Sequence, residues 1–211
     1  MIDLYTWSTP NGRRVSIMLE ECGLEYEVHP INIAKDEQFA PDFLKIAPNN
    51  RIPAIVDRDN NFSLFESGAI LMYLAEKTGK FWPQDHDGKW RTIEWLMWQM
   101  GGVGPMIGQA HHFIKNNKGV SEYSEERYLN ESKRLYGVLD RRLADNEYMA
   151  GKEYTIADMA TWPWISRFEW HTVDITEFKN VLRWYKQIAA RPAVEKGYHV
   201  PVPQPDGIPM P

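Results

Sequence analysis

The first twenty-two residues constrain the fold of this chain more tightly than any other segment. The segment Ile2 to Tyr5 predicts a short β-strand. The residues Ser8 to Asn11 that follow predict a tight turn, because hydroxyl, proline and asparagine residues are typical of strand-to-helix turns and helix starts. Beyond the turn, apolar residues recur at the i, i+3, i+4 and i+7 spacing of one helical face: Val15, Met18, Leu19 and Cys22. The segment therefore predicts a strand, a tight turn and an amphipathic helix.

The turn carries hydroxyls and a carboxamide where a redox-active turn of this kind carries a Cys-x-x-Cys pair. The chain has one cysteine, Cys22, which lies on the apolar helical face one turn after Leu19. We interpret it as a small buried hydrophobe. If thiol chemistry occurs at the turn, the thiol must arrive with a ligand.

The side chains of this turn are suited to holding such a thiol as its anion. A thiol with a pKa of about 8.5 is only a few per cent thiolate at neutral pH, and the thiolate is the nucleophile. Lowering that pKa by about two units requires about 2.7 kcal/mol, of which a helix N-terminus supplies about 0.3–1 kcal/mol. A hydrogen bond to a charged group adds about 1.5–3 kcal/mol, so we hypothesise that Thr9 and Asn11 donate to a thiolate. The alternative is that Thr9 or Asn11 is an ordinary N-cap and Pro10 an ordinary helix-start proline.

Composition excludes several classes of protein. The hydrophobic fraction of 43% and the charged fraction of 25% are those of a globular protein, and 211 residues suffice for one large or two small domains. A net charge of −5, with no basic stripe, argues against binding to nucleic acid. Nine Trp and ten Tyr indicate a wide groove or a large interface as well as a core. A single cysteine and an N-terminus without a signal-peptide pattern lead us to expect a cytoplasmic protein.

The pattern of apolar and turn-forming residues along the chain predicts two domains of different fold class. Residues 1–77 mix strands with helices: after the first helix come strands at Tyr26 to Pro30 and Ala54 to Asp57, a hairpin, and a closing helix. Residues 78–88 contain Gly and Pro and predict a linker, and residues 89–199 have helical periodicity throughout. The Pro-rich tail, 200–211, cannot be helical and is expected to be extended or loosely packed. The predicted fold class is α/β plus all-α, with a βαβ-ββα N-terminal domain.

Three local features of the helical domain carry predictions. Gly101 to Pro105 should kink or interrupt a long helix, because Pro105 lacks an N–H donor. Thr155 and Asp158 have the spacing of an N-terminal capping box. The neighbours His111 and His112 diverge by about 100° around a helix, so they indicate no metal site.

Several motifs resemble the glutathione transferase superfamily. They are the Thr-Pro-Asn-Gly turn that begins at Thr9, the Pro-Asn-Asn-Arg-Ile-Pro-Ala-Ile-Val-Asp run that ends at Asp57, and the segment Leu64 to Glu76. Together with Trp98 to His112, they resemble the bacterial nu-class, disulfide-reducing branch, and the resemblance covers nearly the whole chain. It implies a thioredoxin-like N-terminal domain, an all-helical C-terminal domain and a homodimer.

The resemblance also implies the site. Thr9 and Asn11 would be catalytic. Glutathione would be bound by backbone groups next to a cis Ile52-Pro53 bond, by Glu66 and Ser67 at the start of the closing helix, and by Gln38 and Arg127, the last reaching across from the helical domain. Plain capping is an alternative for Glu66 and Ser67, as is an exposed charge for Arg127. Other transferase classes use a serine or an early tyrosine, which makes Ser8 and Tyr5 rival donors. Arg13 and Arg14 could strengthen the positive field or form a solvated helix face, and we leave them outside the site.

The implied function is glutathione-dependent reduction of a small-molecule disulfide by thiol–disulfide exchange, with two glutathiones or one glutathione disulfide per subunit. One alternative is a glutathione transferase or organic hydroperoxide reductase, in which the same thiolate attacks an electrophile or a peroxide. Another is a non-catalytic glutathione-binding module with a regulatory or assembly role. No Walker loop, dinucleotide fingerprint or Gly-x-Ser-x-Gly elbow is present, so phosphoryl transfer, NAD chemistry and serine hydrolysis have no support.

Overall fold

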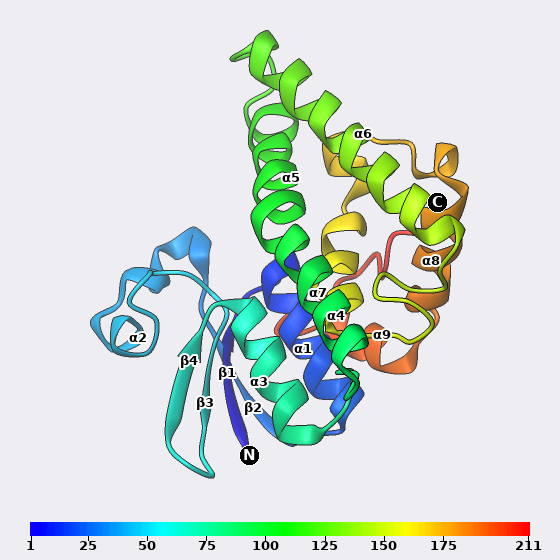
Figure 1. The fold of residues 1–211 in the computed structure, drawn as a ribbon. Coiled ribbons are helices and arrows are strands. Elements are labelled where there is room, and N and C mark those ends of the chain that lie inside the picture. Colours follow the sequence, from blue (N-terminus) through cyan, green and yellow to red (C-terminus); the bar gives the residue numbers. More distant parts are fainter. The chain divides into compact units, whose positions relative to one another are not determined.

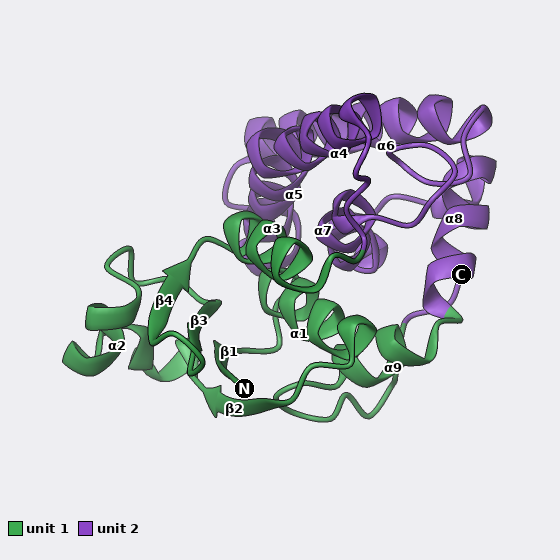
Figure 2. Cartoon of the chain, turned by 60° about the horizontal axis from the view of Figure 1, so that its bottom comes forward, with its two compact units in different colours: residues 1–80, 190–208 green, residues 81–189, 209–211 purple.

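In the computed structural model, which describes residues 1–211, the chain divides into two compact units (Figure 2). Unit 1 comprises residues 1–80 and 190–208, and unit 2 comprises residues 81–189 and 209–211. The division near residue 80 falls within the expected linker. Residues 190–199, which the sequence pattern assigned to the helical domain, pack in unit 1 instead.

Unit 1 is built on a four-stranded mixed sheet with the order β2-β1-β3-β4. The strands are β1 (Ile2–Thr6), β2 (Tyr26–Pro30), β3 (Ala54–Asp57) and β4 (Phe62–Phe65). β1 and β2 are parallel, whereas β3 is antiparallel to both β1 and β4. The parallel pair requires the crossover that the first helix provides. This order confirms the thioredoxin-like fold.

Four helices accompany the sheet in unit 1: α1 (Pro10–Cys22), α2 (Pro41–Ile46), α3 (Ser67–Thr78) and α9 (Pro192–Tyr198) (Figure 1). The predicted apolar face of α1 is buried, with Val15, Met18 and Leu19 fully inaccessible to solvent. We assigned no helix to residues 41–46, because six residues are too few to display helical periodicity.

The α9 helix belongs to unit 1 because it is attached to α1 through close backbone contact. A Cβ atom on Gly197 would lie 2.6 Å from the backbone N of Ile17, so only glycine permits this approach. The Ser16 hydroxyl donates to the Gly197 carbonyl at 2.6 Å. Arg13 donates from Nε to the Tyr198 carbonyl, and its guanidinium lies 3.7 Å from the centre of the Tyr198 ring. Arg13 is fully buried, so of the two roles that the sequence left open for it, the solvated helix face is wrong.

Unit 2 is all-helical, which confirms the predicted class of the second domain. Its α-helices are α4 (His86–Trp98), α5 (Gly104–Ala110), α6 (Glu122–Ala144), α7 (Ile156–Ile165) and α8 (Lys179–Ala189), joined by short 3₁₀ and π-helical segments (Figure 1). The core residues with no exposed surface include Leu96, Ile107, Leu139, Trp162 and Trp184. None of the helices has the length and hydrophobicity needed to cross a bilayer.

The predicted interruption near Pro105 is a widened helical turn. Residues Gln99–Val103 form a π-helical segment, and the backbone at Gly104 keeps right-handed helical angles (φ −57°, ψ −56°). A π-helical turn changes the hydrogen-bond spacing. Pro105 has no backbone N–H to donate, but it lies at the start of α5, after this widened turn. The helical path therefore continues without a break.

The capping box at the start of α7 is present as predicted. The Thr155 hydroxyl accepts from the backbone of α7, and the Asp158 carboxylate accepts from the Thr155 backbone N–H at 3.0 Å. Asp158 also accepts from Met149 N at 2.9 Å and from Trp184 Nε1 at 2.8 Å. Burial raises the pKa of Asp158 to about 6, against the opposing effect of these hydrogen bonds. One carboxylate thus joins α7, α8 and the loop before α7.

Candidate functional site

Thr9 is the N-cap of α1. Its backbone is extended (φ −116°, ψ 161°), and its Oγ1 accepts a hydrogen bond from Gly12 N at 3.1 Å. A hydroxyl has one donor proton and two acceptor lone pairs, so accepting this bond leaves the proton available. The capping role and the thiolate-donor role that we posed as alternatives are therefore compatible.

Gly12 lets the first turn of α1 lie directly against the end of β1. A Cβ atom at this position would lie 2.2 Å from the Trp7 carbonyl oxygen and 2.4 Å from Thr6 Oγ1. No side chain larger than hydrogen fits without moving the backbone of the turn. The close approach holds Thr9 and the half-buried Asn11 at a defined position above the strand end.

The Ile52-Pro53 peptide bond is cis, as the resemblance implies. Sequence physics alone favours trans, because cis occurs in about 5–6% of such bonds. Pro53 is buried directly before β3, and Ile52 is partly exposed, so the backbone of Ile52 lies at the end of the central sheet. The binding role of this pair stays a prediction.

Glu66 and Ser67 do not form a plain capping arrangement. Glu66 is the N-cap of α3, but its side chain makes no capping hydrogen bond, and its backbone has a positive φ of 68°. A non-glycine residue in this region costs about 1–3 kcal/mol and is typical of functional sites. The Glu66 carboxylate is exposed and lies 3.5 Å from Asn49 Nδ2. This geometry leaves the carboxylate available to a cationic group of a ligand.

Arg14, which the sequence interpretation left outside the candidate site, lies directly beside it. It is buried, and its guanidinium donates to the Ser67 hydroxyl at 3.0 Å. Burial lowers the pKa of Arg14 to about 9, with Glu66 acting in the opposite direction, so the side chain is charged at neutral pH. A positive charge therefore lies beside the first turn of α3. One local feature of the sequence could have indicated this position: neither Arg13 nor Arg14 has an acidic residue three or four positions away with which to form an ion pair.

Gln38 lies in a short 3₁₀ turn, Glu37–Phe39, and is 9% exposed. Its Nε2 lies 3.4 Å from Asp36 Oδ1, while its Oε1 is buried without a hydrogen-bond partner. Buried acceptors are normally satisfied, so this oxygen is suited to an N–H donor of a ligand.

Arg127 belongs to unit 2, whereas the other predicted site residues belong to unit 1. It is exposed on α6. It lines a hollow of about 560 Å³ together with other residues of α6, among them Tyr123 and Arg134, and with Met106 of α5. Its proposed contact with glutathione rests on the resemblance.

Of the two rival donors, Tyr5 serves in packing. Its ring stacks on His29 with centroids 4.6 Å apart, and burial raises the pKa of its phenol. Ser8 lies at the turn itself, where its Oγ is 3.3 Å from Gln204 Nε2 of the C-terminal tail.

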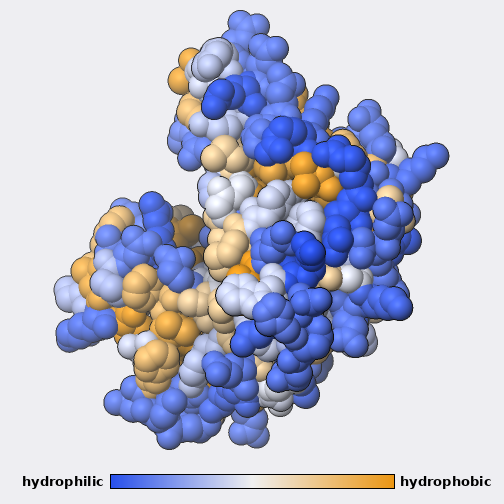
Figure 3. All heavy atoms as spheres, in the orientation of Figure 1, coloured by the Kyte–Doolittle hydropathy of each residue, from blue (hydrophilic) through white to orange (hydrophobic).

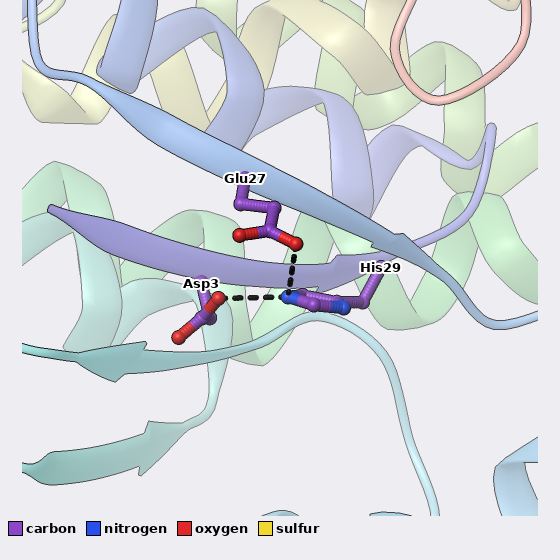
Figure 4. Close-up of side chains that lie close together, drawn as sticks. All are labelled: Asp3, Glu27 and His29. Carbon is purple, nitrogen blue, oxygen red and sulfur yellow. Dashed lines mark hydrogen bonds and ion pairs between the residues drawn. The ribbon is translucent and has the colours of Figure 1, made fainter.

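The cluster of Asp3, Glu27 and His29 on β1 and β2 has ligand atoms of the types that bind metals (Figure 4). His29 Nε2 lies 2.7 Å from Asp3 Oδ1. However, Arg58 donates to both carboxylates, at 2.7 Å from its Nε to Asp3 Oδ2 and at 2.5 Å from its NH2 to Glu27 Oε2. The guanidinium already supplies the cation and lowers the pKa of Asp3. We interpret the cluster as an ion-pair network.

His111 forms a buried pair with His171 in unit 2. His111 Nε2 lies 3.0 Å from His171 Nδ1, and His171 Nε2 lies 2.8 Å from the Tyr136 hydroxyl. Burial lowers the pKa of His111 to about 4, with Arg167 and Lys115 acting in the same direction, and burial also lowers the pKa of His171. Both rings are therefore neutral in the fold at neutral pH.

This pair predicts loss of stability in acid. The unfolded histidines take up protons below a pH of about 6.5, whereas His111 in the fold does so only near its pKa of about 4. Stability is thus fully present above pH 6.5 and falls as the pH approaches 4. His111 alone should cost about 2–3 kcal/mol at pH 4.5. Denaturant unfolding across this range should show a flatter profile for His111→Gln. The exposed neighbour variant, His112→Gln, should keep the parental profile, and equal profiles for all three proteins would contradict the assignment.

Both domains of the chain match models of known protein families. The glutathione S-transferase N-terminal domain matches residues 1–76, and the C-terminal domain matches residues 103–192. Disulfide-bond oxidoreductase YfcG of Escherichia coli (strain K12) is 46% identical over 198 residues, which cover 92% of each chain.

A glutathione transferase from Burkholderia graminis, solved with two glutathione molecules per subunit, is 45% identical, with a TM-score of 0.89 and coverage of 95% of this chain and 88% of that one. A glutathione transferase from Pseudomonas putida, solved with one glutathione disulfide per subunit, is also 45% identical, with a TM-score of 0.89 and coverage of 95% and 91%. Because both domains match and the identity extends over nearly the full length, the chain belongs to the glutathione S-transferase family.

Proposed function

We propose that this protein is a glutathione-dependent disulfide-bond reductase. The observation that carries the proposal is the turn before α1, where Thr9 caps the helix and keeps its hydroxyl proton, with Asn11 beside it and no cysteine present. The name of the relative YfcG, and the two glutathiones or the glutathione disulfide bound to structures of about 45% identity, support it.

The residues present fit glutathione, which has a thiol, an ammonium group and two carboxylates. Thr9 and Asn11 would donate to the thiolate and lower the thiol pKa. The start of α3, with Ser67 and the buried charge of Arg14, suits the γ-glutamyl carboxylate, and the exposed Glu66 suits its ammonium group. The buried Gln38 Oε1 would accept from an N–H of the tripeptide, and the Ile52 backbone would pair with its cysteinyl part.

The reaction balances with glutathione as the only reductant. One glutathione thiolate attacks a substrate sulfur, the substrate S–S bond breaks, and a second glutathione thiolate then resolves the mixed disulfide. Two glutathiones lose two electrons to form glutathione disulfide, and their two thiol protons pass to the two sulfurs of the reduced substrate. The protein contributes binding, orientation and stabilisation of the thiolates.

Two other functions would use the same turn. A glutathione transferase or hydroperoxide reductase needs one bound glutathione and a pocket for an electrophile or a peroxide, whereas disulfide exchange needs a second glutathione. A non-catalytic module would bind glutathione without turnover of any thiol acceptor. The bound pairs of glutathione in similar structures favour disulfide exchange.

The test is glutathione-dependent reduction of a small model disulfide, coupled to glutathione reductase. We expect turnover with one glutathione disulfide formed per substrate disulfide. The Cys22→Ser variant should keep turnover within about twofold, because Cys22 is buried, lies 3.5 Å from the Thr78 hydroxyl, and has a pKa raised by burial. Absence of turnover in the parent, or its loss in Cys22→Ser, would contradict the proposal.

We also propose that the protein is a homodimer that works in the cytoplasm. Unit 1 presents hydrophobic atoms over the region of β4 and α2 (Figure 3), and such patches are typical of protein interfaces. Phe62 at the start of β4 is 45% exposed, and Phe39, two residues before α2, is 55% exposed. The cytosolic glutathione pool is reducing, as the reaction requires. Light scattering should give twice the chain mass of 24.7 kDa, and the monomer mass would contradict the dimer.

A further inference from the structure

The C-terminal tail folds back onto the turn that precedes α1. We expected this Pro-rich segment to be extended or loosely packed, and the structure assigns its residues up to 208 to unit 1. Gln204 Nε2 lies 3.3 Å from Oγ of Ser8, the residue immediately before Thr9. The tail follows α9, which Arg13 and Ser16 attach to α1. A residue near the C-terminus is thereby brought to the thiol-binding turn.

Gln204 is held in place by two further hydrogen bonds. Its backbone N–H donates to His199 Nδ1 at 2.9 Å, and the other nitrogen of that ring lies 3.1 Å from Glu195 Oε1. Its side-chain Nε2 donates to the Val202 carbonyl at 2.7 Å. The tail around Gln204 is therefore an ordered turn with defined partners.

These contacts determine the direction of the bond to Ser8. The Val202 carbonyl can only accept, so the side-chain atom that faces it must be the amide nitrogen of Gln204. The second hydrogen of the same nitrogen then points to Ser8 Oγ, and the Ser8 hydroxyl must be the acceptor. The proton of Ser8 is consequently directed away from Gln204 and is available to a ligand at the turn.

We propose that Ser8 donates a hydrogen bond to a glutathione sulfur and that Gln204 is the positioning residue that orients it. The inference rests on the proposed function. The reaction uses two glutathione thiolates, one after the other. Thr9 and Asn11 are the thiolate donors proposed above. Ser8 lies one residue from Thr9 and supplies a further donor, and the tail becomes part of the site.

A double-mutant cycle with Ser8→Ala, Gln204→Ala and the double variant tests this. The first readout is the pKa of the bound glutathione thiol, followed by its ultraviolet thiolate absorbance, and the second is kcat/KM for a model disulfide. We expect Ser8→Ala to raise the thiol pKa and lower kcat/KM about fivefold, which corresponds to about 1 kcal/mol. Gln204→Ala should act in the same direction, and the double variant should be no worse than Ser8→Ala, because Gln204 acts only through Ser8.

Two substitutions sharpen the test. Gln204→Glu should be more harmful than Gln204→Ala, since a carboxylate would accept the Ser8 proton and add negative charge near the thiolate. Ser8→Thr should keep the donor and restore the parental thiol pKa. Asp206→Asn, an exposed tail substitution, is the matched control and should change neither readout.

Effects of Ser8→Ala and Gln204→Ala that simply add, or an unchanged thiol pKa in both variants, would overturn the inference. Thermal unfolding and glutathione affinity close to those of the parent would show that each variant retains its fold. If the parent binds glutathione but does not reduce disulfides, the proposed function fails, while the pattern of thiol pKa values still decides the role of Ser8.

Discussion

Replacing Thr9 by Ala should lower kcat/KM for disulfide reduction at least tenfold, and Asn11→Ala should have an effect of similar size. A tenfold loss corresponds to about 1.4 kcal/mol of transition-state stabilisation, which is the range expected for one hydrogen bond to a thiolate. The thiolate is the nucleophile, so a higher thiol pKa lowers the reactive fraction at neutral pH. The measurement is the coupled glutathione reductase assay with each variant.

Thr9→Ala also removes the N-cap of α1, which by itself costs about 1 kcal/mol of stability. Two variants separate capping from donation. Thr9→Ser keeps both the acceptor and the proton and should retain turnover. Thr9→Asp caps the helix through its carboxylate but cannot donate, so stability should be maintained while turnover stays low. Full turnover in Thr9→Asp would show that the hydroxyl serves only as a cap.

Asp158→Asn should destabilise the protein by about 3–5 kcal/mol, which is the largest loss of stability that we expect from a single substitution. Each carboxylate oxygen accepts two hydrogen bonds: Oδ1 from Met149 N and Trp184 Nε1, and Oδ2 from Thr155 N and Oγ1. The residue is fully buried, and its pKa of about 6 leaves it ionised at neutral pH. An asparagine must direct its NH₂ group at one of these pairs of neighbours.

Urea unfolding at neutral pH measures the effect of Asp158→Asn. The matched control is Asp145→Asn at the exposed end of α6, which should change the free energy of unfolding by less than about 0.5 kcal/mol. A loss below about 1 kcal/mol in Asp158→Asn would mean that the carboxylate does not hold α7, α8 and the preceding loop together.

The elements that were predictable from sequence are those whose periodicity matches their burial. The face of Val15, Met18 and Leu19 predicted α1, and the alternation of turns and apolar runs located β1, β2 and β3 and the hairpin that contains β4. The capping box at Thr155 was predictable because its two residues lie three positions apart in the chain. These features depend on local chemistry, which the sequence displays directly.

Features that depend on distant partners were not predictable in this way. Arg13 and Arg14 are charged residues on a helix, and their partners Tyr198 and Ser67 lie far away in the chain. The packing of α9 on α1 depends on the absence of a side chain at Gly197, which has no sequence signature of its own. The contact between Gln204 and Ser8 spans nearly the whole chain, so a Pro-rich composition could not reveal it.

Some residues of the candidate site were predicted from the family resemblance, and others were predicted from physical chemistry alone. Local reasoning led to Thr9 and Asn11, because a thiolate needs donors at a helix start. The cis Ile52-Pro53 bond followed only from the family resemblance, and the structure contains it. The positive φ of Glu66 and the buried oxygen of Gln38 became visible only in three dimensions, and both now support binding roles that sequence physics could not distinguish from ordinary capping or surface positions.

The proposed function requires that the turn before α1 holds glutathione as a thiolate without a protein cysteine. The most direct measurement is a pH titration of the ultraviolet thiolate absorbance of glutathione bound to the parent protein. We predict a thiol pKa near 6.5, about two units below the free value of about 8.5. A bound thiol that still titrates near 8.5 or above would contradict this requirement.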